Sequence, residues 1–445
     1  MPTVAQKIKF KIKLIAVNAL LKTSLFFNWP MLGALALWLA TSRVNFSKSP
    51  SEYTVLCISR TIFADDVAAM ASFSRQVKYI NLHRSYFCRI FDYLVENWVK
   101  ENLSEENYHV YDYCHDGRQK YYLYLKRVFP YLRRWLNFDA VFSGNFAYVE
   151  HQELMRVCEE NKVPFLVLFK EGIAATASGA YDKWLDMCRG CRFLGARVLF
   201  YGDKVRRSLL SINIPGLDEN KTKVVGAPRL DDYFTAQERN ADKLNKQVVF
   251  FSFYSDNFFN LTDDSGKLQA AKKRCDDFHA WIMNFAKKHK EFKVIIKTKF
   301  PDHYLTYVKK IYGEIFIDDK DAPDNLIITN LGNPAQLIKE SSAVVGFYST
   351  TLTEAIVAGK ISLSPYFGDI ITDKPWDYFA LYPELINYVK SEADFSEYIL
   401  NPDKYLNYSQ KQRAEFLKEL IYIPDGQASF RAEEAIIEAI KEYKK

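Results

Sequence analysis

The chain has 445 residues with 49% hydrophobic and 26% charged residues, a composition that suits a globular protein of two ordinary domains and excludes a disordered chain. Its net charge of +6 is concentrated in residues 1–51, which carry seven Lys or Arg and no Asp or Glu. A nucleic-acid binder spreads its basic excess over a folded face, so the charge argues against that class. Seven cysteines, an odd number, favour a reducing compartment.

Residues 1–50 form a basic and hydrophobic segment, in which Asn28-Trp29-Pro30 divides two apolar runs that are each shorter than a spanning helix needs. A bent membrane anchor, a cleaved signal peptide and a helix pair packed on the protein itself are alternatives. We expect a segment that lies on the cytoplasmic face of the inner membrane, with its lysines on anionic headgroups.

Residues 51–235 alternate short buried strands with helices, which predicts a parallel, doubly wound sheet. The expected strands are residues 53–59, 77–82, 138–145, 163–169, 196–203 and a last one near 223. Ligands of such sheets bind outside the carboxyl ends of the strands. Polar residues stand at two of these ends, Asn145 after one strand and Glu171-Gly172 after another.

An acid in this position suits a catalytic carboxylate, so Glu171 is the first candidate, although a solvated pair with Lys170 is an alternative. The run Gly226-Ala-Pro-Arg229-Leu-Asp231 closes the domain. Arg229 is suited to a phosphate or a sugar carboxylate, and Asp231 is the second candidate acid. An interdomain ion pair and a helix cap are the alternative roles of this run.

Residues 236–247 are expected to be a linker, residues 248–400 a second α/β domain, and residues 401–445 helices that return to the first domain. Ser252 follows the first strand of the second domain, and Lys297 and Lys299 follow the next. The stretch 340–365 then predicts a strand that ends at Gly346, the hydroxyl cluster Ser349-Thr350-Thr351, and a helix that carries Glu354.

Such a helix start suits a phosphate, because free N–H groups and the positive end of the helix dipole meet there. Glu354 would accept hydrogen bonds from ribose hydroxyls. Among the cysteines, Cys188-Arg-Gly-Cys191 is a single CxxC, so no structural zinc is expected. No Asp-x-Asp motif stands out as a metal site either, and no cofactor is expected.

These motifs, in this order, resemble GT-B glycosyltransferases of bacterial surface polysaccharides (capsule, O-antigen), in the group of Kdo- and sialyltransferases and CDP-glycerol glycerophosphotransferases. The resemblance implies two Rossmann-like domains facing a cleft, a nucleotide bound by the second domain and an acid-Gly pair in the first. The sequence departs from the family where Lys299 stands in place of a His and Pro301 falls one residue late.

The resemblance implies an enzyme that transfers a sugar from a CMP-sugar, of the Kdo or sialic acid type, to a glycan or glycolipid. Two alternatives stay open: a CDP-glycerol or CDP-ribitol phosphotransferase, and a non-catalytic assembly factor with a degenerate fold, for which the missing His-Pro is the main support.

Overall fold

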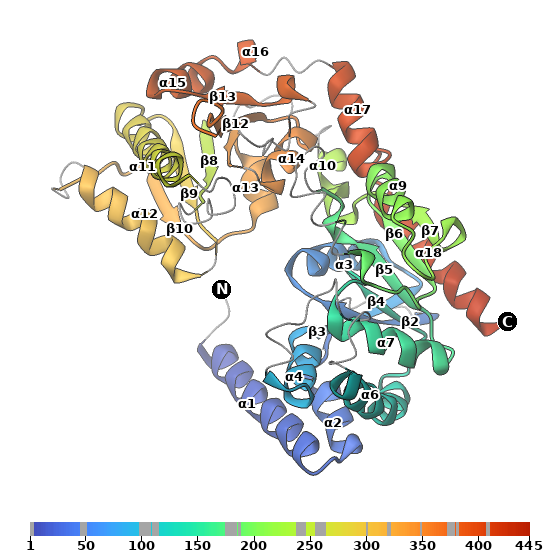
Figure 1. Cartoon of the computed structure of the whole chain (residues 1–445). Coiled ribbons are helices and arrows are strands. Elements are labelled where there is room, and N and C mark those ends of the chain that lie inside the picture. The colour runs from blue at the N-terminus through green and yellow to red at the C-terminus, as the bar shows by residue number, and fades with distance from the viewer. Residues whose placement is uncertain are drawn as a thin grey trace. The chain divides into compact units, whose positions relative to one another are not determined.

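The computed structural model describes residues 4–44, 51–97, 108, 115–173, 185, 188–236, 246–253, 264–299, 301–317, 322–347, 349–371, 379, 382–405 and 410–445. The chain forms two compact units (Figure 1). Unit 1 comprises Met1–Gly172, Lys183–Asp231 and Lys418–Lys445. Unit 2 comprises Ile173–Asp182 and Asp232–Leu417. The last segment of the chain therefore belongs to the same unit as its first half.

Unit 1 is built on a seven-stranded sheet in the order β1-β3-β2-β4-β5-β6-β7. The strands are β1 (Ser42–Arg43), β2 (Tyr53–Ser59), β3 (Val77–His83), β4 (Ala140–Ser143), β5 (Phe165–Phe169), β6 (Arg197–Phe200) and β7 (Thr222–Val224). Neighbours are parallel except β1, which runs antiparallel to β3 at the edge. The central strands β4 and β5 are buried along their whole length, as expected of a sheet with helices on both faces.

The helices of unit 1 are α1 (Val4–Phe26), α2 (Pro30–Ala40), α3 (Thr61–Phe73), α4 (Ser85–Leu94), α6 (His115–Leu136), α7 (Val149–Glu160), α9 (Asp203–Ser211) and α18 (Ala428–Lys444). Short 3-10 turns are η2 (Lys170–Ile173), η3 (Glu219–Lys221) and η4 (Pro228–Leu230). Two helices, α10 (Asp231–Ala236) and α17 (Gln410–Ile421), lie where the chain passes between the units. Helices α2, α4, α6 and α7 pack together, whereas α18 packs on α3 and β6.

Unit 2 has a six-stranded, fully parallel sheet in the order β10-β9-β8-β11-β12-β13. Its strands are β8 (Gln247–Phe251), β9 (Lys293–Lys297), β10 (Leu326–Thr329), β11 (Ala343–Val345), β12 (Ile361–Pro365) and β13 (Asn387–Val389). Its helices are α11 (Ser265–Lys288), α12 (Asp302–Ile315), α13 (Pro334–Glu340), α14 (Thr350–Val357), α15 (Glu392–Leu400) and α16 (Pro402–Tyr405), with the 3-10 turn η7 (Pro383–Leu385).

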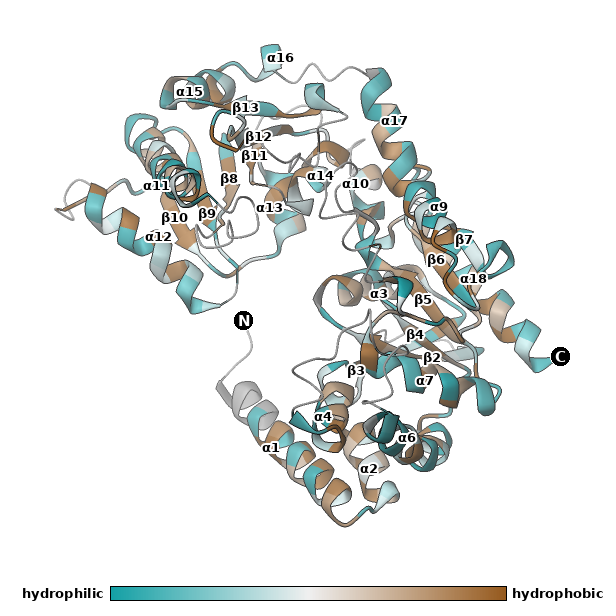
Figure 2. Cartoon of the chain, in the orientation of Figure 1, coloured by the Kyte–Doolittle hydropathy of each residue, from teal (hydrophilic) through white to brown (hydrophobic). Residues whose placement is uncertain are grey.

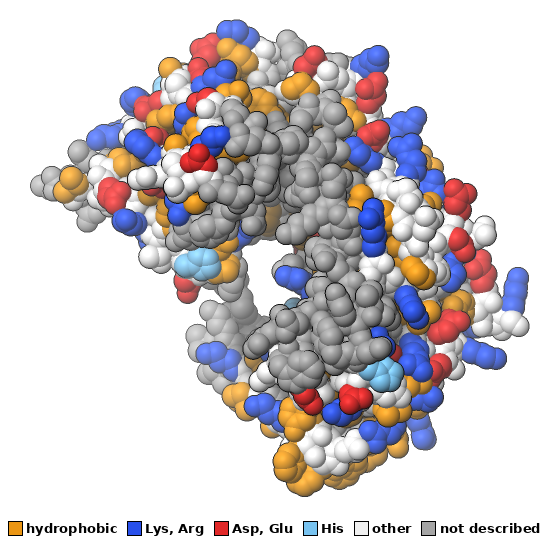
Figure 3. All heavy atoms as spheres, viewed as in Figure 1, with side chains coloured by type: hydrophobic (Ala, Val, Ile, Leu, Met, Phe, Trp, Pro, Cys, Tyr) orange, Lys and Arg blue, Asp and Glu red, His pale blue; other side chains and the backbone are white. Residues whose placement is uncertain are grey.

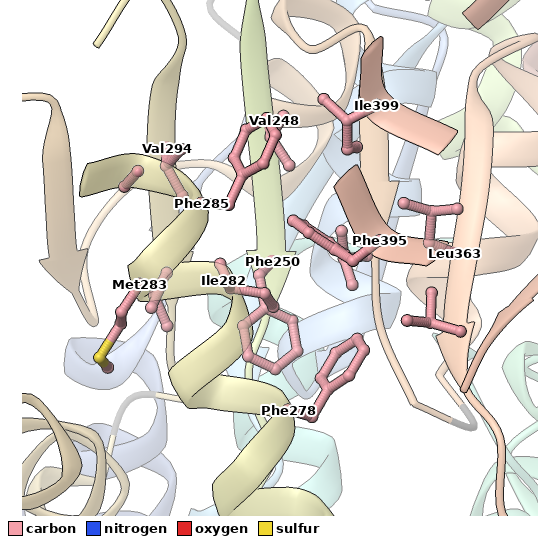
Figure 4. Close-up of a cluster of buried hydrophobic side chains, with 14 of the residues drawn as sticks. Val248, Phe250, Phe278, Ile282, Met283, Phe285, Val294, Leu363, Phe395 and Ile399 are labelled. Atoms are coloured by element: carbon pink, nitrogen blue, oxygen red, sulfur yellow. The ribbon is translucent and has the colours of Figure 1, made fainter. Parts of the chain in front are cut away.

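The core of unit 2 lies between its sheet and the helices α11 and α15 (Figure 4). Phe250 of β8 stands edge-on to Phe278 of α11, with ring centroids 5.5 Å apart. Phe395 of α15 makes the same kind of contact with Phe285, at 5.4 Å. These ring contacts pack α11 against β8 and α15 against α11.

The predicted architecture of two Rossmann-like parallel sheets is confirmed. The strands β1 and β13 are not in the sequence prediction. Both are edge strands of two or three residues, too short to give a pattern of their own.

The N-terminal segment forms a helical hairpin, α1 and α2, whose one face packs on unit 1. Ser24 of α1 donates a hydrogen bond to the carbonyl of Trp29 at 2.6 Å and lies 2.7 Å from the hydroxyl of Tyr124 in α6. Gly33 permits this contact, because a Cβ there would come within 2.2 Å of the Tyr124 hydroxyl. In the part of the chain that the structure describes, no helix combines the length and apolar character needed to span a bilayer. Figure 2 shows the hydropathy along both helices.

Candidate functional site

The hydroxyl cluster of unit 2 lies where the sequence predicts it, between the end of β11 and the start of α14. Ser349 is the N-cap of α14, and its Oγ accepts hydrogen bonds from the Thr351 backbone N at 3.3 Å and the Thr351 hydroxyl at 2.9 Å. Ser349, Thr350 and Thr351 are all half-buried. The side chain of Ser349 thus fixes the first turn of the helix while its own hydroxyl proton stays available.

Gly346 joins this helix to the sheet. Its N–H continues the ladder by donating to Leu363 O of β12 at 3.0 Å. A Cβ at Gly346 would come within 3.3 Å of the Leu352 side chain, a tight contact. At the other end of α14, Arg413 donates to the carbonyls of Ile356 and Val357 at 3.2 and 3.1 Å. The side chains of Ser349 and Arg413 therefore satisfy backbone groups at the two ends of this short helix.

Glu354 lies one turn into α14, half-buried, and accepts a hydrogen bond from the Tyr233 hydroxyl at 3.2 Å. Next to Tyr233, Asp232 pairs with Lys339 at 3.0 Å, and the Lys339 ammonium lies 5.4 Å from the Tyr233 ring. Tyr233, which comes two positions after the run 226–231, thus contacts the helix that carries Glu354.

The two predicted lysines after β9 have different surroundings. Lys297 is half-buried and donates to the carbonyls of Thr298 and Asn330 at 2.7 and 2.9 Å, and burial lowers its pKa. Lys299 is exposed, and its ammonium lies 5.6 Å from the Tyr304 ring. Lys297 therefore joins the ends of β9 and β10, and Lys299 is the better placed of the two to meet a ligand.

Ser252 is buried at the end of β8 and lies 2.8 Å from Nε2 of His279. The other ring nitrogen of His279 lies 2.7 Å from the carbonyl of Cys275, which only accepts, so Nδ1 carries the proton. Burial lowers the pKa of His279 to about 4, so the ring is neutral at pH 7 and Nε2 accepts a hydrogen bond from the Ser252 hydroxyl. Ser252 then has no hydroxyl proton left for a phosphate, and its contacts explain it as a packing residue.

The corresponding edge of unit 1 carries Glu171, directly after β5. Glu171 is in the turn η2, its side chain is 33% exposed, and it forms an ion pair with Lys170. The Lys170 backbone N donates to Gly144 O at 3.0 Å, which ties this turn to the end of β4. Gly172 follows in the same turn. The carboxylate is thus at the carboxyl edge of the sheet and open to solvent on one side.

Asn145, by contrast, is buried and serves the turn after β4. Its Oδ1 accepts from the Ala147 backbone N at 2.7 Å, and its carbonyl lies 2.9 Å from Nδ1 of the buried His151. His151 also contacts the Ser143 hydroxyl at 3.1 Å. These contacts explain Asn145 as a turn-forming residue and take its side-chain oxygen away from any ligand.

Arg229 and Asp231 both have structural partners. Arg229 is 9% exposed and pairs with the fully buried Asp66 at 3.3 Å, and it donates to the Tyr201 hydroxyl at 2.8 Å. Asp231 is 2% exposed, and its two carboxylate oxygens accept from the backbone N of Ala428 and Ser429 at 3.0 and 2.7 Å.

Asp231 therefore caps α18, and the catalytic role expected for it is not supported, because both oxygens are occupied and solvent is excluded. The ligand role expected for Arg229 is not supported either. Nearby, Gly226 has φ of +92°, and a Cβ there would come within 2.8 Å of Ala428, so this turn needs glycine to admit α18.

A group that the sequence analysis missed lies at the end of β3. Arg84 forms a bidentate pair with the buried Glu150, and its guanidinium lies 3.4 Å from the centre of the Tyr148 ring. Next to it His83 is exposed on one side. Partial burial of its ring, together with the positive charges of Arg89, Arg60 and Arg84, lowers its pKa. The signal was present, because His83 and Arg84 directly follow the predicted strand 77–82 and so belong to the same edge as Glu171.

Within the described residues, no group of three or more His, Cys, Asp or Glu side chains is arranged to hold a metal ion. Cys188 and Cys191 are buried.

No protein-family model and no curated protein matches the chain. Solved structures do. A protein of Listeria monocytogenes assigned as a UDP-N-acetylglucosamine 2-epimerase aligns with a TM-score of 0.51 and 10% identity, over 88% of this chain and 98% of its own. The UDP-GlcNAc 2-epimerase of Methanocaldococcus jannaschii aligns with a TM-score of 0.50 and 12% identity, over 86% of this chain and 99% of its own. At such identities the likeness shows the fold alone, and this chain has the GT-B fold.

Proposed function

We propose that the chain is a nucleotide-sugar-dependent glycosyltransferase whose unit 2 binds the donor. The main support for this proposal is the arrangement of hydroxyl groups at the start of α14. Among the described residues, neither the Ser349 hydroxyl proton nor the Thr350 hydroxyl has a hydrogen-bond acceptor, and both stand at the positive end of the helix. A phosphate only accepts hydrogen bonds, so it is the ligand that these donors suit. The similar structures support this class, since those from Listeria monocytogenes and Methanocaldococcus jannaschii are named as 2-epimerases of UDP-N-acetylglucosamine, a nucleotide sugar.

The rest of the donor site follows from the neighbours of this helix. Glu354 is placed one turn further along to accept hydrogen bonds from ribose hydroxyls, with Tyr233 orienting its carboxylate at 3.2 Å. Lys299, exposed after β9, supplies a positive charge that offsets the charge growing on the departing phosphate. The donor that we propose is a CMP-sugar of the Kdo or sialic acid type, as the order of the motifs implies.

Glu171 is the proposed catalytic acid or base of unit 1. In the transfer, the bond between the anomeric carbon and the phosphate oxygen breaks with its electron pair on the nucleotide, and the acceptor hydroxyl forms the new bond. Glu171 would take the proton of that hydroxyl. Its partial exposure distinguishes it from the buried acids Asp66, Glu150 and Asp231 of the same unit. The proposed acceptor is a glycan or glycolipid of the cell surface.

Thermal-shift titration with CMP, CDP, UDP and GDP tests the donor site, because a ligand that binds only the native state raises the melting temperature. We expect a shift with CMP or CDP, and at least about tenfold weaker binding in Ser349→Ala and Thr350→Val, from loss of one charge-assisted hydrogen bond. Ser391→Ala is the matched control, since Ser391 caps α15 of the same unit in the same way.

The result assigns the class. A melting-temperature shift with UDP or GDP would instead indicate a UDP-sugar or GDP-sugar donor. The absence of a shift with any nucleotide would favour the non-catalytic assembly factor. Release of CMP from a CMP-sugar with transfer of the sugar supports the proposal, whereas transfer of a phosphorus-containing group from CDP-glycerol supports the phosphotransferase.

A further inference from the structure

The outward face of α1 carries large apolar side chains that are exposed to solvent. Ile12, Ile15 and Phe26 are 62%, 69% and 72% exposed. They recur at helical spacing with the exposed Ala16 and Ala19, so they form one stripe along the helix. The opposite face of α1 is also apolar but is buried on unit 1. The outward face of a helix on a water-soluble body is mainly polar, whereas on α1 the polar Lys22 and Thr23 interrupt a stripe that is otherwise apolar.

The stripe continues over the hairpin turn and onto α2 and α6. Exposed residues there are Phe27, Trp29, Met31 and Trp38 of the hairpin and Leu123, Tyr131 and Trp135 of α6. The two parts are joined, since Arg127 of α6 donates to the Asn28 side chain in the turn at 2.6 Å. Figure 3 shows hydrophobic side chains gathered at the lower end of the view, over the hairpin turn that Figure 1 places there. We call these residues the hairpin surface.

The charges around the hairpin surface are almost all positive. Lys11, Lys13 and Lys22 of α1 are exposed, and residues 1–51 contain no acid. On α6, the exposed Arg127, Arg133 and Arg134 lie along the same half of the helix, and its one acid, Asp116, lies at the far end. Lys126 of the same half pairs with Glu160 at 3.1 Å. Exposed Trp, Tyr and Phe rings surrounded by lysine and arginine match the boundary between the acyl chains and the anionic headgroups of a bilayer.

We propose that the hairpin surface is a membrane-docking surface whose partner is a bilayer with anionic lipids. The rings of the turn and the α1 stripe enter the headgroup and upper acyl region, and the lysines and arginines contact lipid phosphates. The helices lie in the interface rather than cross it, in keeping with the absence of a spanning helix among the described residues. A second copy of this chain fits less well, because two surfaces with the same positive rim repel each other.

Flotation of the full chain with vesicles tests the proposal. We expect binding to phosphatidylcholine vesicles that contain phosphatidylglycerol, weaker binding to phosphatidylcholine alone, and a decrease with rising salt. The combined change Phe26→Ser, Phe27→Ser and Trp29→Ser should reduce partitioning at least about tenfold, because the removed side chains are those that enter the bilayer. Ile317→Ser with Leu331→Ser is the matched control, since both side chains are exposed, at 88% and 53%, in unit 2.

The charge contribution is tested separately with Lys11→Gln and Lys22→Gln, which should weaken binding to the anionic vesicles and leave binding to neutral vesicles unchanged. The proposal is overturned if the wild type does not float, or if the serine variant floats like the wild type. It is also overturned if light scattering shows a dimer that the serine variant converts to a monomer, since a second copy would then cover this surface. An unchanged melting temperature shows that each variant is folded, and none of these readouts depends on nucleotide binding.

Discussion

The carboxyl edges of the two sheets both carry polar residues but use them differently. In unit 1 the charged side chains pair with each other or with backbone: Arg84 with Glu150, Arg229 with Asp66, and Asp231 with the first turn of α18. In unit 2 the start of α14 carries neutral hydroxyls, two of which have unused protons among the described contacts. A residue type that suits chemistry is therefore a weaker signal in unit 1 than in unit 2.

The physical reason is the cost of burial. A carboxylate or guanidinium that loses water must be paired, so a buried charge near a strand end is first of all a structural group. A half-buried hydroxyl has a small desolvation cost, so it needs no protein partner and can donate a hydrogen bond to a ligand. Glu171 differs from the buried acids of unit 1, since it is partly exposed and its ion-pair partner among the described residues is Lys170.

The strongest test of this contrast is Glu171→Gln. If Glu171 handles the acceptor proton, turnover should fall by about 10² to 10⁴, while the melting temperature and the nucleotide-induced shift stay unchanged. Glu52→Gln is the matched control, because Glu52 is an exposed acid at the amino-terminal end of the same sheet. Unchanged turnover in Glu171→Gln would exclude this acid from the mechanism. Glu171 would then have a structural role, as Asp66, Glu150 and Asp231 have.

Arg229→Met should destabilise the protein by about 3–5 kcal/mol, because it leaves Asp66 buried without its cation. Tyr201→Phe removes the hydroxyl that donates to Asp66 and accepts from Arg229, and should cost about 2 kcal/mol. Urea unfolding of both variants provides the comparison. A stable Arg229→Met protein with weakened donor or acceptor binding would instead support the ligand role that the sequence predicted for Arg229.

His279 should make unit 2 sensitive to acid. The unfolded chain binds a proton at His279 as pH falls through about 6.5, whereas burial keeps the pKa in the native state at about 4. Because the unfolded state binds more protons in this range, stability is lost as pH falls, by about 3 kcal/mol between pH 7 and pH 4. Calorimetry of the wild type and of His279→Asn should show a smaller pH dependence in the variant, and equal slopes would exclude His279 as the cause.

Asp231→Ala should cost about 2 kcal/mol, since two backbone N–H groups at the start of α18 lose their acceptor. Asp231→Asn keeps one acceptor oxygen and should cost less. The folded fraction of both variants should retain full turnover, measured below the unfolding transition. A loss of turnover in a fully folded Asp231→Asn protein would restore this residue as a catalytic candidate.

The smallest effects should separate the two lysines after β9. Lys297→Met should lower stability by about 1 kcal/mol, since the carbonyls of Thr298 and Asn330 lose a donor, with little change in nucleotide affinity at equal folding. Lys299→Met should leave stability unchanged and weaken nucleotide binding about tenfold. Melting temperatures without and with nucleotide measure both quantities, and the reverse pattern would exchange the two roles.

Much of the fold could be predicted from the sequence because buried parallel strands are continuous apolar runs, and Gly346-Ser349 marks a strand end and a helix start by local chemistry. The partners of single side chains could not be predicted. Asp231 and Ala428 are nearly two hundred positions apart, and only the folded chain shows that one caps the other. Tyr201 and Asp66 likewise meet through the order of strands in the sheet, which no local pattern encodes.

The return of α18 to unit 1 sets an order on synthesis. Unit 1 contains Met1–Gly172 but also Lys418–Lys445, so its last helix leaves the ribosome after all of unit 2. Until then Asp231 lacks its two backbone donors, and the buried Tyr79 lacks its hydrogen bond to Glu433. In a nascent chain stalled before α18, unit 2 would therefore be complete, whereas the sheet of unit 1 would lack one of the helices that cover it. Chaperones or proteases would act on the chain in this state.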